Sequence, residues 1–303
     1  MDSPLTPTAR PLAGVLWMLL TGAQFIAVTA LVKYVGAALP APETAFLRYA
    51  MGLVFLIPIF PAMMRAGLDR KALGLFGLRG TLHAFGVMLW FYAMTQIPIA
   101  EVTSLGYINP VFVTIGAVVF LGERLAARRI AAVVVALIGA LIILRPGVRE
   151  LSPGHVAMLA NAVVFSGSYL IAKIMADRVA PGVVVAWLSL VVTIVLAPFA
   201  IAVWVWPTWS QLGWLFLVAA FATGGHFTMT LAFRAAPLAV TQPVTFLQLV
   251  WSVLLGALVF SEPVDGWVLL GGTLVVGAVS FITWREAVLK RRAVTPPSVA
   301  TKV

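Results

Sequence analysis

The chain has 303 residues, of which 62% are hydrophobic and 10% are charged, and its formal net charge is +10. Soluble domains average about 45–50% apolar and about 25% charged residues, so a water-soluble globule of this length would expose most of its excess apolar surface. The composition excludes a cytosolic enzyme, a disordered chain and a nucleic-acid-binding protein, and it indicates a polytopic membrane protein.

Ten apolar stretches are long enough to cross a bilayer, because a hydrocarbon core of about 30 Å requires about 20 residues of α-helix. The first stretch is preceded by only Arg10 and exceeds the apolar part of a typical signal peptide, so we interpret it as a retained helix. The connections are short and leave no room for a soluble domain. The expected helices cover residues 12–35, 43–64, 72–95, 100–122, 127–145, 153–175, 182–206, 210–233, 237–261 and 264–284.

Basic residues gather on one side of the expected topology. If the N-terminus is inside, the cytoplasmic segments hold fourteen Lys and Arg residues, whereas the outer loops hold Arg145 and Arg149. Cytoplasmic loops of membrane proteins are enriched in Lys and Arg, which explains the net charge without a nucleic-acid partner. We therefore expect a multi-pass protein of the bacterial cytoplasmic (inner) membrane with both termini in the cytoplasm.

The chain repeats itself with an offset of 139 residues. Pro98 corresponds to Pro237 and Glu123 to Glu262, and the Pro-to-Glu spacing is 25 in both copies. Chance similarity between apolar helices is the alternative explanation. Five helices per copy is an odd number, so the second copy must be inverted in the membrane, as in many secondary transporters. We predict an all-α membrane protein with ten transmembrane helices as two inverted five-helix repeats around a central cavity, at 12–145 and 153–284, followed by a basic cytoplasmic tail at 285–303.

Each copy carries a Glu directly after an apolar helix, in Phe-Leu-Gly-Glu at 120–123 and Val-Phe-Ser-Glu at 259–262, and then a Gly-containing final helix. In this pattern the chain, from about residue 12 to 285, resembles the EamA family of the drug/metabolite transporter superfamily, and within it the YddG type, which exports aromatic amino acids. The resemblance implies ten helices, a central cavity, and the fifth and tenth helices as outer supports. One departure is the Lys that first helices of this family often carry, which is absent from 25–29, while Lys173 occupies the comparable place in the sixth helix.

Polar side chains gather in eight of the expected helices, whereas the fifth and tenth are almost wholly apolar and can face lipid. Polar groups are costly in hydrocarbon, so those in the eight helices are expected to line a cavity or contact another helix. Asn109 and Gln248 correspond under the 139-residue offset and lie at mid-helix depth. The candidate substrate-binding residues are Gln24, Arg48, His83, Trp90, Tyr107, Asn109, Asn161, Tyr169, Trp187, His226 and Gln248.

Several of these side chains have a second interpretation. Ser, Thr and Asn can join neighbouring helices by hydrogen bonds, and His83 and His226 are either buried neutral residues or substrate and proton sites. Arg48 and Arg79 lie near opposite membrane faces, where they would snorkel to the headgroups or attract a substrate carboxylate. Glu101 is placed to pair with Arg48.

The chain contains no motif for an energy-consuming or enzymatic step. No Walker motif or phosphate loop occurs, no cysteine is present, and the three His are scattered, so no cofactor and no metal site are expected. Paired acids and His/Asp clusters at mid-depth, which an intramembrane enzyme would need, are also missing.

We predict a secondary transporter that exports small metabolites across the inner membrane by alternating access. Amino acids, the aromatic ones foremost, are the favoured substrates. A passive uniporter or channel-like facilitator is the alternative. The expected partners are a small-molecule substrate and the lipid bilayer, with no nucleic acid and a monomeric state.

Overall fold

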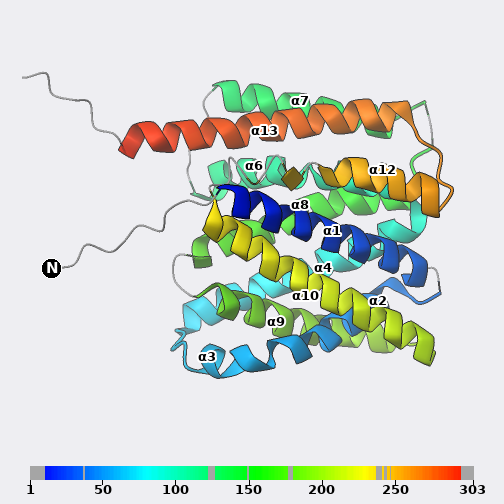
Figure 1. Ribbon diagram of the computed structural model, residues 1–303, viewed down its shortest axis with the longest axis vertical. Helices are drawn as coiled ribbons and strands as arrows, with labels where there is room; N and C mark the ends of the chain where they lie inside the picture. The colour runs from blue at the N-terminus through cyan, green and yellow to red at the C-terminus, as the bar shows by residue number, and fades with distance from the viewer. Residues whose placement is uncertain are drawn as a thin grey trace, which may run out of the picture.

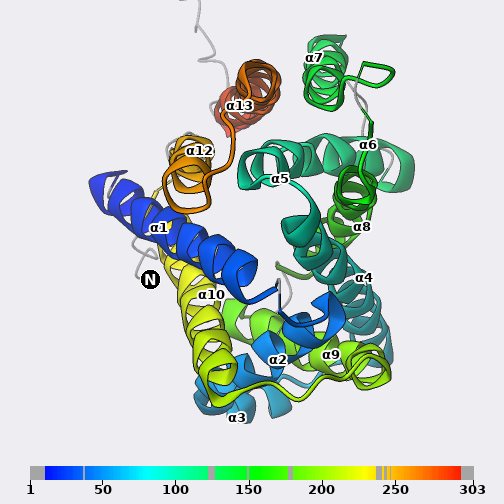
Figure 2. The ribbon, with the colours of Figure 1, turned by 90° about the vertical axis from the view of Figure 1, so that its right-hand side faces the viewer.

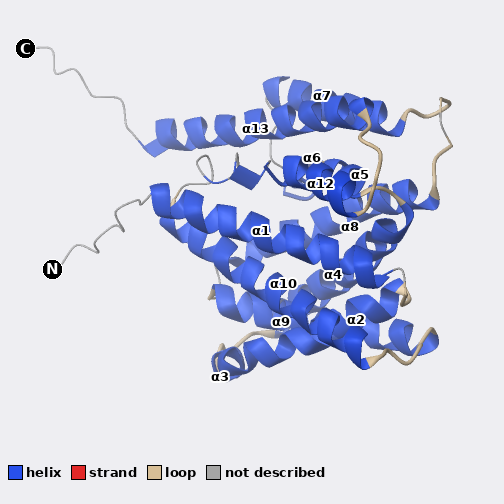
Figure 3. Cartoon of the chain, turned by 45° about the vertical axis from the view of Figure 1, so that its right-hand side comes forward, coloured by secondary structure: helices blue, strands red, loops and turns tan. Residues whose placement is uncertain are grey.

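The computed structural model describes residues 11–36, 38–121, 127–148, 150–176, 180–236, 241, 244–245 and 247–294. These residues form helices joined by loops, and none of them lies in an extended strand (Figure 3). The all-helical prediction is therefore confirmed for this part of the chain. In chain order the elements are α1 (Pro11–Gly36), α2 (Ala41–Gly52), the 3-10 helix η1 (Leu53–Ile59), α3 (Phe60–Met64), α4 (Arg70–Gln96), α5 (Ile99–Gly106), α6 (Asn109–Leu121), α7 (Ala127–Leu144), α8 (Pro153–Ala176), α9 (Pro181–Ala202), α10 (Trp209–Ala235), α12 (Leu247–Val259) and α13 (Gly266–Val294).

Most of the helices are apolar enough to lie in a membrane. Six segments have the length and composition of a full span, and shorter apolar helices occur at four further places. All of them overlap stretches expected from hydropathy, although Ile99–Val113 covers only part of the expected 100–122 and Leu247–Val259 only part of 237–261. The six long segments are Leu12–Val35, Ala41–Met64, Arg70–Gln96, Pro153–Ile171, Gly182–Ala202 and Trp209–Met229, and the shorter ones are Ile99–Val113, Ile130–Leu144, Leu247–Val259 and Gly266–Phe281.

Within the described residues, two of the expected helices are interrupted, and both interruptions involve proline. The second expected helix runs as α2, then as η1, which contains Pro58, and then as α3. Proline lacks an N–H and clashes with the preceding turn, which disfavours a regular α-helix. The fourth expected helix breaks between α5 and α6, at Tyr107 and Ile108, and Pro110 follows in the first turn of α6, where its missing N–H costs no hydrogen bond.

The last helix is longer than expected. The sequence predicts a span that ends at Trp284 and a polar tail after it, but α13 continues to Val294. The added residues include Arg, Glu, Ala, Leu and Lys, which are strong helix formers and need no apolar surroundings. Conversely, α9 ends at Ala202, so Trp204 and Trp206 follow the helix rather than completing it.

The helices lie side by side and pack in pairs that relate the two halves of the chain (Figure 1). α1 packs along α10, α4 along α8, α2 along α9, and α7 along α13. Exchanging each helix for its counterpart in the other half converts the α1–α10 pair into the α8–α4 pair and leaves the other two pairs unchanged. Figure 2 shows α7 and α13 together at one side, beyond α5 and α12, with the remaining helices around a centre. This placement agrees with the expected role of the two apolar helices as outer supports.

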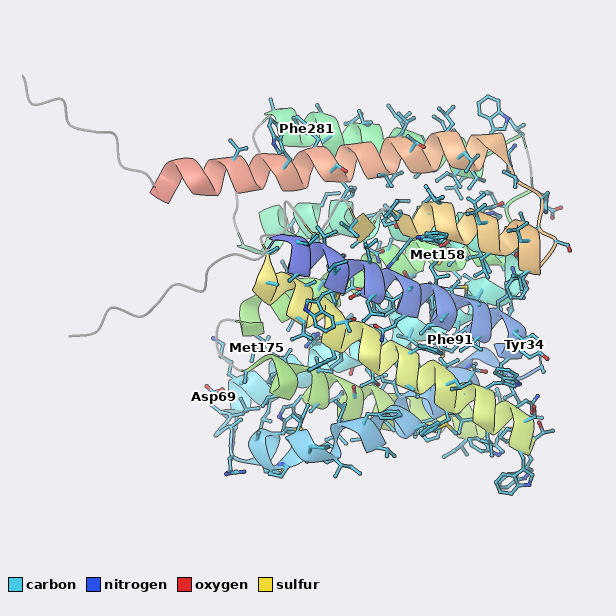
Figure 4. The ribbon with its side chains drawn as sticks, in the orientation of Figure 1. Tyr34, Asp69, Phe91, Met158, Met175 and Phe281 are labelled. Atoms are coloured by element: carbon cyan, nitrogen blue, oxygen red, sulfur yellow. The ribbon has the colours of Figure 1, made fainter. Side chains whose placement is uncertain are left out.

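The centre of packing lies between α4 and α8. Phe91 of α4 and Met158 and Met175 of α8 are at most 2% exposed, and Figure 4 shows them among the packed helices. By contrast, Tyr34 at the end of α1 is 63% exposed. Their tight packing against each other makes α4 and α8 the elements that position central side chains.

Glycine permits the closest contacts between the helices. A Cβ atom added to Gly271 of α13 would lie 2.5 Å from the carbonyl oxygen of Gly139 in α7, and one added to Gly86 of α4 would lie 2.3 Å from the Phe165 ring of α8. Small residues let helix backbones approach each other, and the resulting van der Waals contact is a main source of helix association in lipid.

We predict that Gly271→Ala destabilises the protein, because the new methyl group meets backbone atoms of α7 that cannot rotate away. Overpacking of this kind costs about 1–3 kcal/mol, which thermal unfolding of the purified protein in detergent measures. Gly277→Ala on the same helix is the matched control, since nothing lies within 4 Å of its added Cβ. Equal unfolding temperatures for the two variants would contradict the close α7–α13 contact.

Candidate functional site

His83 of α4 joins the two halves of the chain inside the bundle. The residue is 5% exposed. Its Nε2 lies 3.0 Å from the Tyr49 hydroxyl of α2, and its Nδ1 lies 3.3 Å from the Ser168 hydroxyl of α8. Both ring nitrogens therefore have a hydroxyl partner, one from each half. Buried polar groups require such partners, and here they also fix the plane of the ring.

Aromatic rings surround the same imidazole. The centroid of Phe165 lies 4.7 Å from that of His83, and Tyr169, one turn further along α8, lies 6.5 Å away in an edge-on arrangement. Tyr169 is 44% exposed although its neighbour His83 is buried. An accessible phenol ring beside a buried imidazole provides an apolar face with polar groups next to it, which suits a flat organic ligand.

Two arginine side chains lie near this group. The guanidinium carbon of Arg48 stands 4.0 Å from the centroid of the Tyr49 ring, a cation–π contact. Arg79 is 7% exposed, and its Nη1 donates a hydrogen bond to the Val184 carbonyl of α9 at 3.3 Å. The snorkelling interpretation is therefore wrong for Arg79, because its side chain is held by a neighbouring helix instead of reaching the headgroups. Arg79 precedes His83 by one turn of α4, and the Tyr49 ring beneath Arg48 contacts His83 through its hydroxyl.

Gln24 and His226 lie where α1 meets α10. The Gln24 side-chain oxygen accepts a hydrogen bond from the Thr228 hydroxyl at 2.8 Å, and Thr228 also lies 2.8 Å from the Thr21 hydroxyl. The His226 ring meets the Phe25 ring edge-on at 5.3 Å. Thr21 and Gln24 thus face α10, and the Gln24 oxygen already serves the contact between these helices.

The residues of the fourth and ninth expected helices contact different neighbours. Gln248 of α12 faces α1, where its Cγ is 3.7 Å from the Cβ position of Gly22. The Tyr107 hydroxyl donates to the Thr245 carbonyl at 2.8 Å, which joins the two helices to each other. The side-chain oxygen of Asn109 is buried without a hydrogen-bond partner among the described residues. Asn109 therefore keeps an acceptor for a ligand or water.

The remaining candidates occupy packed positions. The Asn161 amide donates to the Gly86 carbonyl at 2.6 Å and so ties α8 to α4. Trp187 of α9 stacks on Phe76 at 6.0 Å, and its indole nitrogen is buried with no partner in the described part of the chain. Trp90 packs against the main hydrophobic core. The structure thus gathers Arg48, His83 and Tyr169, whereas these three residues serve packing between helices.

Sequence reasoning missed a set of ion pairs at the end of the bundle where α1 and α12 terminate. Lys33 of α1 pairs with Glu262, just after α12, and also donates to the Ile97 carbonyl at 3.3 Å. The second Glu262 oxygen accepts from the Ile99 N–H at 2.9 Å. Arg145 pairs with Asp265 at the same end. The correspondence of Glu262 with Glu123 in the repeat singled out Glu262 in the sequence. It did not show which residue Glu262 pairs with.

The expected Arg48–Glu101 pair does not form. Glu101 lies 2.6 Å from His155 at the start of α8, and both side chains are buried. Glu101 sits in the first turn of α5, next to the end of the bundle, while Arg48 is nearly two turns into α2. The sequence does not show how the two helices pack against each other. Arg48 was expected to be the partner because of its similar depth in the membrane, and this expectation was wrong.

Comparison with known proteins decides the family. The EamA-like transporter family matches residues 12–145 and again residues 152–284. The chain belongs to the EamA-like transporter family. It is 30% identical to a riboflavin transporter of Rhizobium johnstonii, over 94% of this chain and 95% of that protein. It is 28% identical to an S-adenosylmethionine uptake transporter of Rickettsia felis (91% and 94%) and 30% identical to a pseudopaline exporter of Pseudomonas aeruginosa (88% and 94%).

A solved crystal structure shares the fold of this EamA-like protein. The two superpose with a TM-score of 0.61 at 21% sequence identity, covering 94% of this chain and 99% of the other. The family and the named relatives are small-molecule transporters, not enzymes, and they are multi-pass membrane proteins. No group of three His, Cys, Asp or Glu suited to a metal ion occurs among the described residues.

We predict that Glu262→Gln lowers the stability of the protein, because Lys33 loses its counter-ion while the Ile99 N–H keeps an acceptor. Hydrogen bonds to charged groups contribute about 1.5–3 kcal/mol, so the loss is measurable by thermal unfolding in detergent. Glu150→Gln is the control, since that residue is exposed in a loop. Adding Lys33→Met to Glu262→Gln should restore part of the stability, because it removes the unpaired charge. A further loss of stability in the double variant, equal to that of Lys33→Met alone, would contradict the ion pair.

Proposed function

We propose that the chain is a secondary carrier that moves a small organic metabolite between its two repeats by alternating access. The observation that carries the proposal is His83, whose ring contacts Tyr49 from the first half and Ser168 from the second. Carriers with inverted repeats bind substrate at midplane, where the repeats meet. His83 is about 20 Å along α4 from its first residue, which places it near the middle of a span.

The exchange of helix pairs between the halves supports inverted repeats at 12–145 and 153–284, with the predicted central cavity between them. In this proposal the chain is a monomer in the bacterial inner membrane. The proposed substrate site consists of Arg48, His83 and Tyr169, with His226 of α10 and Asn109 of α6 as further members, while Gln24 and Asn161 serve helix contacts. Saturable counterflow distinguishes a carrier of this kind from the alternative, a passive uniporter or channel-like facilitator.

The substrate proposal is wider than the aromatic amino acids favoured by the sequence. The relatives are named for riboflavin, S-adenosylmethionine and pseudopaline, and both uptake and export occur among those names. A molecule with a flat ring suits the accessible face of Tyr169 beside Phe165 and His83. Aromatic amino acids remain one substrate class within this proposal. Flux measurements in both directions determine whether the protein takes up or exports its substrate.

We predict that purified protein in proteoliposomes takes up at least one compound from a panel of riboflavin, S-adenosylmethionine, tryptophan, phenylalanine and threonine. Tyr169→Ala should raise the half-saturation concentration for that compound about three- to tenfold, the range expected for losing an aromatic contact. Tyr92→Ala is the matched control, because Tyr92 is an accessible tyrosine of α4 (37% exposed) with no ring neighbour among the described residues.

Two results would contradict this proposal. One is a complete lack of solute movement across the panel by protein that unfolds cooperatively. The other is an equal effect of Tyr169→Ala and Tyr92→Ala, which would remove Tyr169 from the substrate path. If threonine alone is transported, the ring-containing substrate class is wrong and the carrier assignment stands.

The absence of cysteine from the chain allows a direct test of the proposed orientation. In intact cells, a membrane-impermeant maleimide should label Glu150→Cys, in the loop between α7 and α8, and should not label Arg65→Cys, between α3 and α4. After the membrane is permeabilised, both should react, because both positions are exposed. The opposite pattern would place the N-terminus outside, against the distribution of Lys and Arg.

A further inference from the structure

We propose that the transported molecule carries an anionic group, a carboxylate or a phosphate, and that Arg48 and Arg79 bind it inside the membrane. This inference rests on the proposed function, because it names the chemical class of substrate for the same site. It starts from the two guanidinium groups that the helices hold beside His83.

Arg79 is buried and incompletely bonded. The residue is 7% exposed, and it makes one hydrogen bond, from Nη1 to the Val184 carbonyl at 3.3 Å. Its Nε is buried with no acceptor among the described residues. A guanidinium carries five N–H donors, so most of the hydrogen-bonding capacity of Arg79 is unused. It lies about 14 Å along α4 from Arg70, well inside a bilayer core of about 30 Å.

Arg48 approaches the same region from α2. It is half-buried and stands over the Tyr49 ring, whose hydroxyl lies 3.0 Å from His83. Within the described ranges it forms neither a hydrogen bond nor an ion pair. Arg79 precedes His83 by one turn of α4, and Arg48 stands over the ring whose hydroxyl contacts His83, so two guanidinium groups approach His83 from two helices.

No described carboxylate balances these charges. An unpaired charge in the membrane interior is costly and marks a functional position by default. Arginine binds carboxylate and phosphate through two parallel hydrogen bonds, and this pairing strengthens where water is excluded. Apart from the exposed Glu150, the acidic side chains with described positions are engaged elsewhere: Glu43 with the Val205 N–H, Asp69 with the Ala72 N–H, Glu101 with His155, Glu262 with Lys33, and Asp265 with Arg145.

The neighbouring rings suit the rest of such a molecule. Tyr169, 44% exposed, and Phe165 line the α8 side of His83. A ligand with its anionic group on the arginines would therefore place an adjacent ring against these side chains. Benzoate and phenyl phosphate contain both parts, and benzamide has the shape of benzoate without its charge.

Thermal unfolding of the full-length protein in detergent at constant ionic strength tests the inference with these three probes. We expect benzoate or phenyl phosphate to raise the unfolding temperature of the unaltered protein in a saturable way, and benzamide to have no effect. The probe that acts distinguishes a carboxylate site from a phosphate site. Arg48→Gln should weaken the apparent affinity about tenfold, the effect of losing one charged hydrogen-bonding partner, and Arg48→Lys should weaken it less.

Arg65→Gln is the control, since Arg65 is exposed between α3 and α4 and should leave the affinity unchanged. Equal stabilisation by benzamide and benzoate, no stabilisation by either anion, or an unchanged affinity in Arg48→Gln would overturn the inference. Because Arg79→Gln risks misfolding, Arg79→Lys serves as the second variant, and a loss of anion affinity without a loss of cooperative unfolding supports the assignment. Anion binding without any solute flux would refute the carrier proposal alone, and flux of neutral compounds unaffected by Arg48→Gln would refute the anion site alone.

Discussion

The lack of water in the hydrocarbon core is the constraint on which this structure depends. Every polar group placed there must find a partner within the protein or border an enclosed wet space. The hydrogen bonds from Asn161 to Gly86 and from Thr228 to Gln24 satisfy this requirement between helices. Near His83 the requirement is met only in part, because Arg48 and Arg79 have donors without an acceptor among the described residues.

The polar contacts at one end of the bundle differ from those in its middle. At the end where α1 and α12 terminate, opposite charges meet in Lys33–Glu262 and Arg145–Asp265. In the middle, two arginines lie with histidine and tyrosine and without a described acid. The charges of the first arrangement neutralise each other, whereas those of the second have no described counter-ion.

The sequence predicted the positions of the helices along the chain far better than it predicted which side chains meet between helices. Hydropathy alone located the spans, since the membrane requires long apolar stretches, and the Pro and Glu recurrences showed the repeat that the family match also finds. The sequence did not show that Asn161 faces α4, and it left Gln24 as a substrate candidate when its oxygen serves α10. Glu101 shows the reason: its partner His155 is distant in sequence, and pairing across helices depends on packing that one helix does not encode.

Glu262 contacts three separate segments at once: its own turn through the Gly256 carbonyl, α1 through Lys33, and the start of α5 through the Ile99 N–H. Any motion that draws α1 away from α12 at this end must part an ammonium from a carboxylate. That attraction opposes separation of the two helices, so opening the bundle on that side meets an energetic barrier.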